Sequence, residues 1–246
     1  MKVKKIYKGV LVATLVIFTV SCGTSVKAVD NSNINDSENL VNENLSTNTV
    51  DSSEFVSAIE GGEIEMSDTL KVIANRKAIR SFLPEQITEE ELNIVLMAGS
   101  SAPIGLGEKA YYKLTVVQDK EFMSRISDAT EEFFNYNPLM SDPMHGAPTL
   151  VIISTIKDRH PEFEGLEIAS AACIADTMLI GATDLGLGSV YICNFVEGMH
   201  YKPELIEELG LEEGYVPVAG VLIGYPKTPI TYDGELTQSV EVNYIR

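Results

Sequence analysis

The sequence predicts one layered domain of the α/β or α+β class over residues 67–226. Three observations predict this class. Segments with the apolar spacing of helices alternate with short apolar runs typical of strands, in the order α-α-β-α-β-α-β-α-β. The run at 148–154 is apolar almost throughout, as in a strand that is buried on both faces. Residues 167–184 form the longest helical segment and are apolar on nearly every side, which predicts a central helix.

The first elements follow from apolar spacing and from one capping signal. Residues 68–76 have the spacing of a helix. Thr88 is expected to begin the next helix, because T-E-E-E matches a capping box in which the Glu91 side chain reaches back to the Thr88 amide. A short strand at 114–117 and a helix at 120–135 are predicted before the buried strand.

The later elements are separated by glycines. Gly186 is expected to end the long helix in a left-handed conformation, and Gly210 to end a shorter one. Residues 227–246 have no helical pattern and are expected to form an extended arm. The elements predicted here are a helix at 167–184, a strand at 188–192, a helix at 203–209 and a strand at 216–223.

Composition and charge exclude several classes of function. The chain has 18 Lys and Arg against 36 Asp and Glu, and its formal net charge is −18. Such a chain repels phosphate backbones and anionic lipid surfaces, so we expect no nucleic-acid binding. Its 3 cysteines, Cys22, Cys173 and Cys193, are too few for a disulfide framework or a four-cysteine zinc site. We interpret the 3 scattered histidines as surface or packing residues and expect no metal.

The N-terminal segment has the features of a secretory signal. Residues 1–8 are basic and residues 9–20 are apolar, and a helix of that length spans only about 18 Å, too little to cross a membrane. The sequence V-S-C-G resembles a bacterial lipoprotein signal, although Thr19 stands where Leu is usual. The resemblance implies that residues 1–21 are removed and that Cys22 carries a lipid. The alternative is a plain signal peptide in which Cys22 is incidental.

Residues 22–66 are predicted to be a disordered tether. The stretch is rich in Asn, Ser, Asp, Glu and Thr and has few large apolar residues, so it cannot bury enough surface to offset its chain entropy. Together with a lipid on Cys22, it would hold the domain at the extracytoplasmic face of the cell membrane. The membrane would then be contacted through the lipid anchor only.

Common catalytic motifs are missing from the sequence. The G-L-G-S run at 186–189 is not a dinucleotide fingerprint, because its glycines end a helix and Tyr191 stands where the third Gly is needed. There is no Walker A lysine, no HExxH and no G-x-S-x-G elbow. Cys173 falls in the long apolar helix and is interpreted as core filler. We therefore expect no catalytic side chain, and either a cofactor enzyme or a binding protein.

One cluster of cations stands out in this acidic chain. The segment I-A-N-R-K-A-I-R-S-F at 73–82 places Arg76, Lys77 and Arg80 within five residues, at the end of a predicted helix. Guanidinium groups bind phosphate bidentately, so the cluster is a candidate dianion site. The alternative is a basic helix end that complements the helix dipole.

Six segments carry a resemblance to a known protein family, in the order in which that family has them. They span about 160 residues, and each is weak alone. They are R-K-A-I-R-S-F-L-P at 76–84, A-G-S-S-A-P at 98–103, K-L-T-V-V at 113–117, G-A-P-T-L-V-I-I at 146–153, A-T-D-L-G-L-G-S-V-Y-I at 182–192 and V-A-G-V-L-I-G-Y-P at 218–226. Together they resemble the FMN-dependent nitroreductase family. The resemblance implies an α+β fold, a three-layer α-β-α sandwich around a mixed, mainly antiparallel sheet, in an intertwined homodimer.

The resemblance also implies which residues bind FMN. Arg76 falls on the family's phosphate-binding Arg, and Lys77 and Ala78 fall on the next cofactor positions, where Ala78 replaces a usual Ser. Arg80 falls near the pyrimidine edge of the flavin, where a cation stabilises the negative charge of the reduced state. The segment after the third predicted strand falls where a backbone amide meets flavin N5, and it contains Tyr191, Ile192 and Cys193.

Two parts of the sequence depart from the family pattern. The family's P-S-A-x-N-x-Q-P-W loop is replaced by P-I-G-L-G-E-K-A-Y-Y at 103–112, so Ile104 and Gly105 take cofactor positions without the usual Asn and Gln. Lys227 is the nearest candidate for the basic pair that completes the phosphate site. Tyr111, Tyr112 and Phe134 could line a substrate pocket, although core packing is the simpler role.

The implied function is a ping-pong FMN oxidoreductase. NAD(P)H or another donor would reduce the flavin, and a small-molecule acceptor would reoxidise it. Dehydrogenation and reductive dehalogenation are alternatives within the superfamily. A further alternative is a non-catalytic surface lipoprotein that keeps the fold and binds a ligand or flavin.

Overall fold

The computed structural model describes residues 66–136 and 142–246. The predicted signal, most of the predicted tether and Cys22 lie outside these residues. The centre of the fold is a four-stranded antiparallel sheet in the order β1-β2-β4-β3. Its strands are β1 (Tyr112–Val117), β2 (Thr149–Ile156), β3 (Gly188–Ile192) and β4 (Tyr215–Gly224).

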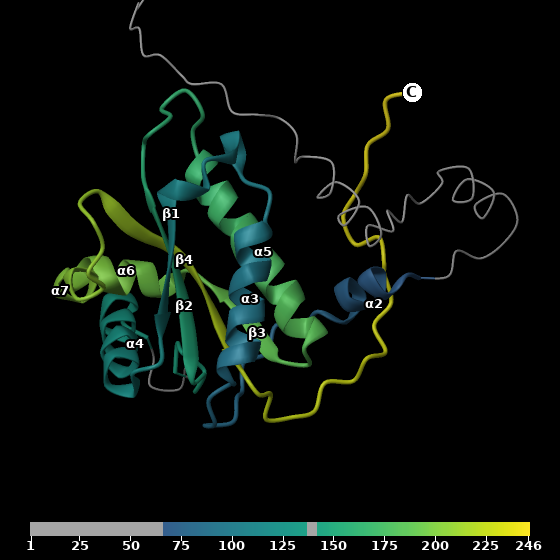
Figure 1. Ribbon diagram of the computed structural model, residues 1–246, viewed down its shortest axis with the longest axis horizontal. Helices are drawn as coiled ribbons and strands as arrows, with labels where there is room; N and C mark the ends of the chain where they lie inside the picture. The colour runs from purple at the N-terminus through teal and green to yellow at the C-terminus, as the bar shows by residue number, and fades with distance from the viewer. Residues whose placement is uncertain (1–65, 137–141) are drawn as a thin grey trace, which may run out of the picture. The chain divides into compact units, whose positions relative to one another are not determined.

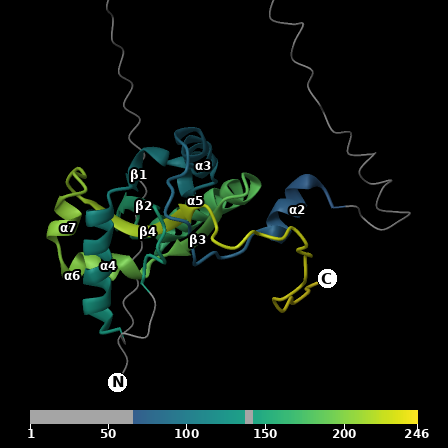
Figure 2. The same cartoon turned by 90° about the horizontal axis from the view of Figure 1, so that it is seen from below.

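Helices cover both faces of the sheet, as Figures 1 and 2 show. On one face, α3 (Glu89–Ser101) packs along α5 (Leu166–Asp184). On the other face, α4 (Lys120–Phe134) packs against α6 (Asn194–Tyr201), which α7 (Glu204–Glu207) follows. Alternating residues of β2 divide between the two cores, with Leu150 and Ile152 toward α4 and α6. The predicted α+β, three-layer fold is confirmed.

Local signals in the sequence account for several helix ends. The Thr88 side chain accepts a hydrogen bond from the Glu91 amide at 3.2 Å, and the Glu91 carboxylate accepts one from the Thr88 amide at 2.8 Å, so the predicted capping box is present. Gly186 adopts φ 74° after α5, as expected of a left-handed helix stop. Both helices therefore begin or end for the local reasons that the sequence indicates.

The region after β3 differs from the prediction. Residues 194–201 form α6, which was not predicted, and the helix expected at 203–209 is only the single turn α7. Helix α6 has 8 residues and a Gly in its interior, so neither its length nor its propensity signals a helix. Its formation depends on burial, because Phe195 and Met199 are fully buried between α4 and the sheet.

Helix α5 is less central than predicted. It is long and apolar enough to cross a membrane by composition, yet half of its most apolar window is buried in the domain, as in a core helix. Its other side is open: Ile168 is 51% exposed, and Cys173 is exposed rather than core filler. The apolar face of α2 (Asp68–Asn75) is similarly uncovered, with Ile73 40% exposed. Apolar groups of α5 and α2 are therefore exposed in the described part of the chain.

Residues 227–246 contain no helix or strand and form an extended arm, which Figure 1 shows passing beside α2. Several hydrogen bonds attach it to the domain, two of them near the ends of α2 and α5. The Gly234 amide donates to Asn75 Oδ1 at 2.8 Å, and the Tyr232 hydroxyl donates to the Thr183 carbonyl at 3.3 Å. Gly234 lies so close to the Ala74 carbonyl that a Cβ atom would stand 2.2 Å from that oxygen. The start of the arm is therefore fitted closely to the end of α2.

Candidate functional site

The cationic segment, residues 76–80, lies along the outer side of β3. Arg76 ends α2 in an extended conformation. Ala78 then pairs with Ser189 of β3 in an isolated parallel bridge, and the Ile79 amide donates to the Ser189 carbonyl at 3.0 Å. The chain order therefore places two guanidinium groups, from Arg76 and Arg80, at one edge of the sheet.

The residues that follow β4 return to the same place. The Leu83 amide donates to the Tyr225 carbonyl at 2.9 Å, and the Lys227 amide donates to the Ser81 carbonyl at 3.0 Å. Eight of the predicted cofactor residues are thus brought to one edge of the sheet. They are Arg76, Lys77, Ala78, Arg80, Tyr191, Ile192, Cys193 and Lys227.

The segment from Tyr191 to Cys193 joins β3 to α6. Ile192 is buried in the core, whereas Tyr191 is 37% exposed and Cys193, the N-terminal cap of α6, is exposed. Partial burial of Tyr191 raises the pKa of its hydroxyl above the usual value. Helix α6, which the sequence did not predict, begins directly after Cys193 and so fixes where the chain leaves the sheet edge.

The three cations differ in their surroundings. Lys77 Nζ lies 3.3 Å from the Asp233 carboxylate and donates to the Thr231 carbonyl at 3.3 Å, so it is held by the C-terminal arm. Within the described residues, Arg76 and Arg80 form no ion pair. The two arginines are therefore the cations of the segment that are open to an anion.

Ile104 and Gly105 lie elsewhere in the same copy of the chain. The Gly105 amide donates to Ser170 Oγ at 3.0 Å, near the first turn of α5. The cationic segment lies near the other end of that helix, where Ile79 contacts Gly188. Because α5 has 19 residues, its two ends are about 28 Å apart. One copy of the chain therefore does not bring Ile104 and Gly105 to the cationic segment.

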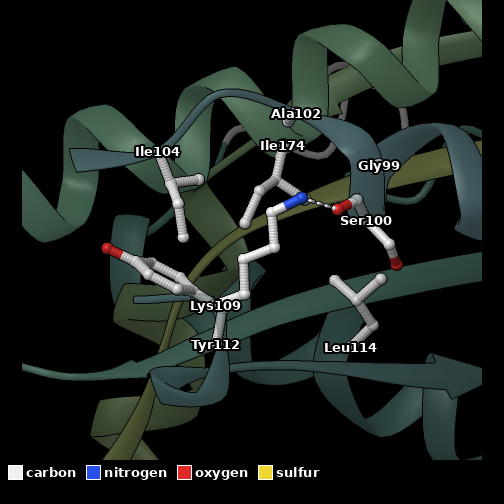
Figure 3. Close-up of a pocket in the computed structure, with 8 residues that line it drawn as sticks. All are labelled: Gly99, Ser100, Ala102, Ile104, Lys109, Tyr112, Leu114 and Ile174. Atoms are coloured by element: carbon white, nitrogen blue, oxygen red, sulfur yellow. Dashed lines mark hydrogen bonds between the residues drawn. The ribbon is translucent and has the colours of Figure 1, made fainter. Parts of the chain in front are cut away.

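A small cavity lies beneath the loop at 103–112. It has a volume of about 80 Å³ and is lined mainly by apolar groups of α3, β1 and α5. Figure 3 shows Ile104, Tyr112 and Ile174 around it, with the Lys109 ammonium group reaching across to the Ser100 carbonyl. Tyr112 thus contributes to this loop region, whereas Phe134, at the end of α4, lies in an exposed aromatic cluster with Phe133.

Sequence reasoning missed the group that holds this divergent loop. Glu108 Oε2 accepts hydrogen bonds from Arg159 Nη2 at 2.8 Å and from His160 Nε2 at 3.0 Å, and the Arg159 guanidinium lies over the Tyr111 ring. These contacts tie the loop to the connection between β2 and α5. The bond to Glu108 raises the pKa of His160, and the same bond lowers the pKa of Glu108. No local pattern signals this cluster, because 52 residues separate Glu108 from His160.

We expect His160→Gln to weaken the attachment of the loop at 103–112 to the connection between β2 and α5, by an amount that depends on the pH. The folded-state pKa of His160 is raised. Its contribution to the free energy of unfolding is therefore complete below the ordinary value of 6.5 and is lost as the pH rises through the raised value. The Glu108 contribution is present above 4.5 and is lost as the pH falls through the lowered value. The urea concentrations at half-unfolding of the wild type and the variant should therefore differ most between pH 4.5 and 6.5. They should converge at alkaline pH. A difference that persists unchanged at alkaline pH would contradict this assignment.

Comparison with known proteins identifies the family. The model of the Nitroreductase family matches residues 73–225, more than half of the chain. The chain belongs to the nitroreductase family. This nitroreductase-family chain is 30% identical over 162 residues to a provisionally named NADH dehydrogenase/NAD(P)H nitroreductase of Archaeoglobus fulgidus, covering 66% of this chain and 87% of that protein. It is 28% identical over 172 residues to the FMN reductase (NAD(P)H) of Bacillus subtilis, covering 65% and 67%.

Solved structures show the same fold. A nitroreductase with bound FMN from Desulfitobacterium hafniense matches with a TM-score of 0.63 and 23% identity, covering 74% of this chain and 100% of that one. An FMN-dependent nitroreductase from Clostridium difficile matches with a TM-score of 0.55 and 26% identity, covering 72% and 97%. Residues 73–225, which the family model matches, contain all four strands and the cationic segment.

Proposed function

We propose that this nitroreductase-family chain is an FMN-dependent, NAD(P)H-linked oxidoreductase. One observation carries the proposal: the cationic segment, the end of β3 and Lys227 meet at one sheet edge although they are distant in sequence. The relatives named as an NAD(P)H nitroreductase and an FMN reductase, and the neighbours with bound FMN, support this cofactor and this donor.

The residues at this edge fit the phosphate of FMN. Arg76 and Arg80 offer guanidinium groups in a chain of net charge −18, and guanidinium forks match phosphate oxygens. Ser189, which pairs with Ala78, carries a buried hydroxyl without a partner among the described residues. The Ser189 hydroxyl is therefore a hydrogen-bond donor beside Ala78, which lacks the hydroxyl of the usual Ser. Lys77 is engaged by the arm, so we assign it to holding the arm.

The site is completed by a second copy of the chain. Ile104 and Gly105 lie near the opposite end of α5 from Arg76, and α5 has an open, partly apolar side. A two-fold pair with antiparallel α5 helices would bring Ile104 of one copy toward Arg76 of the other. The arm beyond Gly234 would then cover the partner with its exposed apolar residues, which are Leu236, Val240, Val242, Tyr244 and Ile245.

FMN, when bound, supplies the two-electron chemistry of a ping-pong reaction. The chain binds the phosphate through Arg76 and presents a cation, Arg80, to the charge that develops on reduction. The backbone at Tyr191–Cys193 forms the adjoining wall, and the loop at 103–112 from the partner limits access. The acceptor is a small molecule that this loop admits.

Cofactor identification tests this function. The chain without residues 1–23 should purify yellow, and denaturation should release FMN. Mass spectrometry and the absorbance of the released compound identify it. NADPH or NADH should bleach the bound flavin, and air should restore its colour. A colourless protein that takes up no FMN when titrated would favour the non-catalytic binding lipoprotein.

The same proposal includes a lipid anchor at Cys22 and a position on the extracytoplasmic face. Its support is the basic start, the apolar run and the V-S-C-G sequence. Cys22→Ala should release the protein from membranes or leave its signal uncleaved, as fractionation and mass measurement would report. Cys193→Ala is the matched control and should leave fractionation unchanged. Normal processing and membrane retention of Cys22→Ala would show that Cys22 is not the anchor.

A further inference from the structure

A tight turn before β2 holds a histidine in an uncommon conformation. The Asp142 carboxylate accepts three hydrogen bonds of 2.8 Å, from the Met144 amide, the Gly146 amide and the Ser127 hydroxyl. His145 stands inside this turn at φ 53°, in the left-handed region that a residue other than Gly rarely adopts. Such a conformation persists where the surroundings enforce it, and it is concentrated at functional sites.

The turn lies beside the cationic segment. Gly146 and Ala147 line one cavity with Pro84, and a Cβ atom at Gly224 would contact both Pro148, just after the turn, and Phe82, two residues beyond Arg80. His145 itself is half-buried, and its ring forms no hydrogen bond with residues in the described ranges. The turn that carries His145 therefore lies beside the residues that follow Arg80, and the positive charge of Arg80 acts on the imidazole.

We propose that His145 is the proton acceptor of the flavin site: it takes up a proton from solvent when the flavin is reduced and releases it when the flavin is reoxidised. This inference rests on the proposed function, because it requires FMN beside Arg80. It assigns a role to a residue that the sequence interpretation left as surface or packing.

The electrostatics of the turn support this role. Burial and the nearby charge of Arg80 lower the pKa of His145, and Asp142 opposes that shift only in part. The charged groups that line the adjoining cavity are Asp142 and, from α4, Asp128, Glu131 and one cation, Lys120. Burial and Arg80 therefore favour the neutral imidazole. A new negative charge at the edge that Arg80 faces would compensate the arginine and raise the proton affinity of His145.

The step balances in electrons and protons. A nicotinamide donor delivers two electrons and one proton to the flavin, which gains one negative charge. Solvent supplies the second proton, which His145 holds as an imidazolium. The acceptor then takes two electrons and both protons, one from the flavin and one from His145, so the site returns to its starting charge.

Histidine NMR of the FMN-loaded protein tests the proposal directly. The chain has 3 histidines, so selective labelling gives few signals, and His145→Asn assigns one of them by its loss. Asn tolerates the left-handed conformation, so the turn should be kept. On reduction with dithionite, the proton affinity of His145 should rise about hundredfold or more, that is, by at least two pKa units. His200, which is exposed on α6, is the control and should shift far less.

The pH dependence of the reduction equilibrium gives a second readout. Near neutral pH the wild type should take up about two protons per two electrons, a change of about hundredfold per pH unit. His145→Asn should take up about one, a change of about tenfold per pH unit, with unchanged affinity for oxidised FMN. If FMN binds but His145 does not shift, or the variant still takes up two protons, the proposal is overturned while the proposed function stands. A protein that binds no FMN would overturn both.

Discussion

Arg76→Ala is expected to lower the affinity for FMN by roughly 10- to 150-fold. The substitution removes a charge-assisted contact with the phosphate, worth about 1.5–3 kcal/mol. Arg76 is half-buried at the end of α2 and is fixed there by its amide, which donates to the Val72 carbonyl at 3.0 Å. Quenching of flavin fluorescence during titration measures the dissociation constant. Arg76→Lys should recover part of the loss, because it keeps the charge without the planar fork.

Lys71→Ala is the matched control for Arg76→Ala. Lys71 lies on the same helix, where it pairs with Asp68 at 3.1 Å, so its loss should leave FMN affinity unchanged. Lys77→Ala should act through the arm, since Lys77 contacts Asp233 and Thr231. If Arg76→Ala and Lys71→Ala have equally small effects, the cationic segment is only a solvated helix end.

A site formed by two copies of the chain predicts a second effect of Arg76→Ala. Arg76→Ala and Ile104→Glu should each impair both sites of a dimer, because each site would use Arg76 from one copy and Ile104 from the other. Refolding the two variants together should yield mixed dimers with one intact site. FMN bound per dimer at a limiting concentration would then exceed that of either parent. No gain on mixing would place all binding residues in one copy.

Phe195→Ala should have the largest effect on stability, about 3–5 kcal/mol. Phe195 is 0% exposed and packs between α4 and the sheet, with its ring against Gly220. A domain is stable by only about 5–15 kcal/mol, so the variant should approach unfolding at moderate temperature. Urea denaturation measures the free energy of unfolding. FMN affinity should fall as well, because α6 begins directly after Cys193.

Phe163→Ala is the matched control for the core substitution. Phe163 is 49% exposed in the connection between β2 and α5, so its removal should change the free energy of unfolding by less than about 1 kcal/mol. Similar losses from the two variants would mean that α6 is not held by its buried face.

The elements that could be predicted are those with local causes. The capping box at Thr88, the continuous apolar run of β2 and the Gly186 stop are each encoded within a few residues. Helix α6 could not be predicted in this way. Its stability comes from contacts with α4 across the fold, and Gly198 in its interior lies where a Cβ atom would meet the Thr130 amide at 2.6 Å. The close packing that requires this Gly also removes the usual helix signal.

The same distinction applies to the candidate site: features that are local in sequence could be predicted, and contacts between distant residues could not. The cationic cluster could be recognised because Arg76, Lys77 and Arg80 are adjacent in sequence. The sequence could not reveal that the arm engages Lys77, because 156 residues separate it from Asp233. Likewise, only the fold shows that Ile104 and Arg76 lie near opposite ends of α5.

The bridge between Ala78 and Ser189 has a consequence for solubility. Strand β3 is the last strand of the sheet, and its outer backbone groups are the kind that recruit strands from other molecules into aggregates. The cationic segment covers part of that strand, and charged side chains beside a sheet margin discourage such pairing. Residues suited to holding an anionic ligand thus also protect the protein against self-association. Substitutions that detach the segment should therefore lower the concentration at which the protein stays in solution.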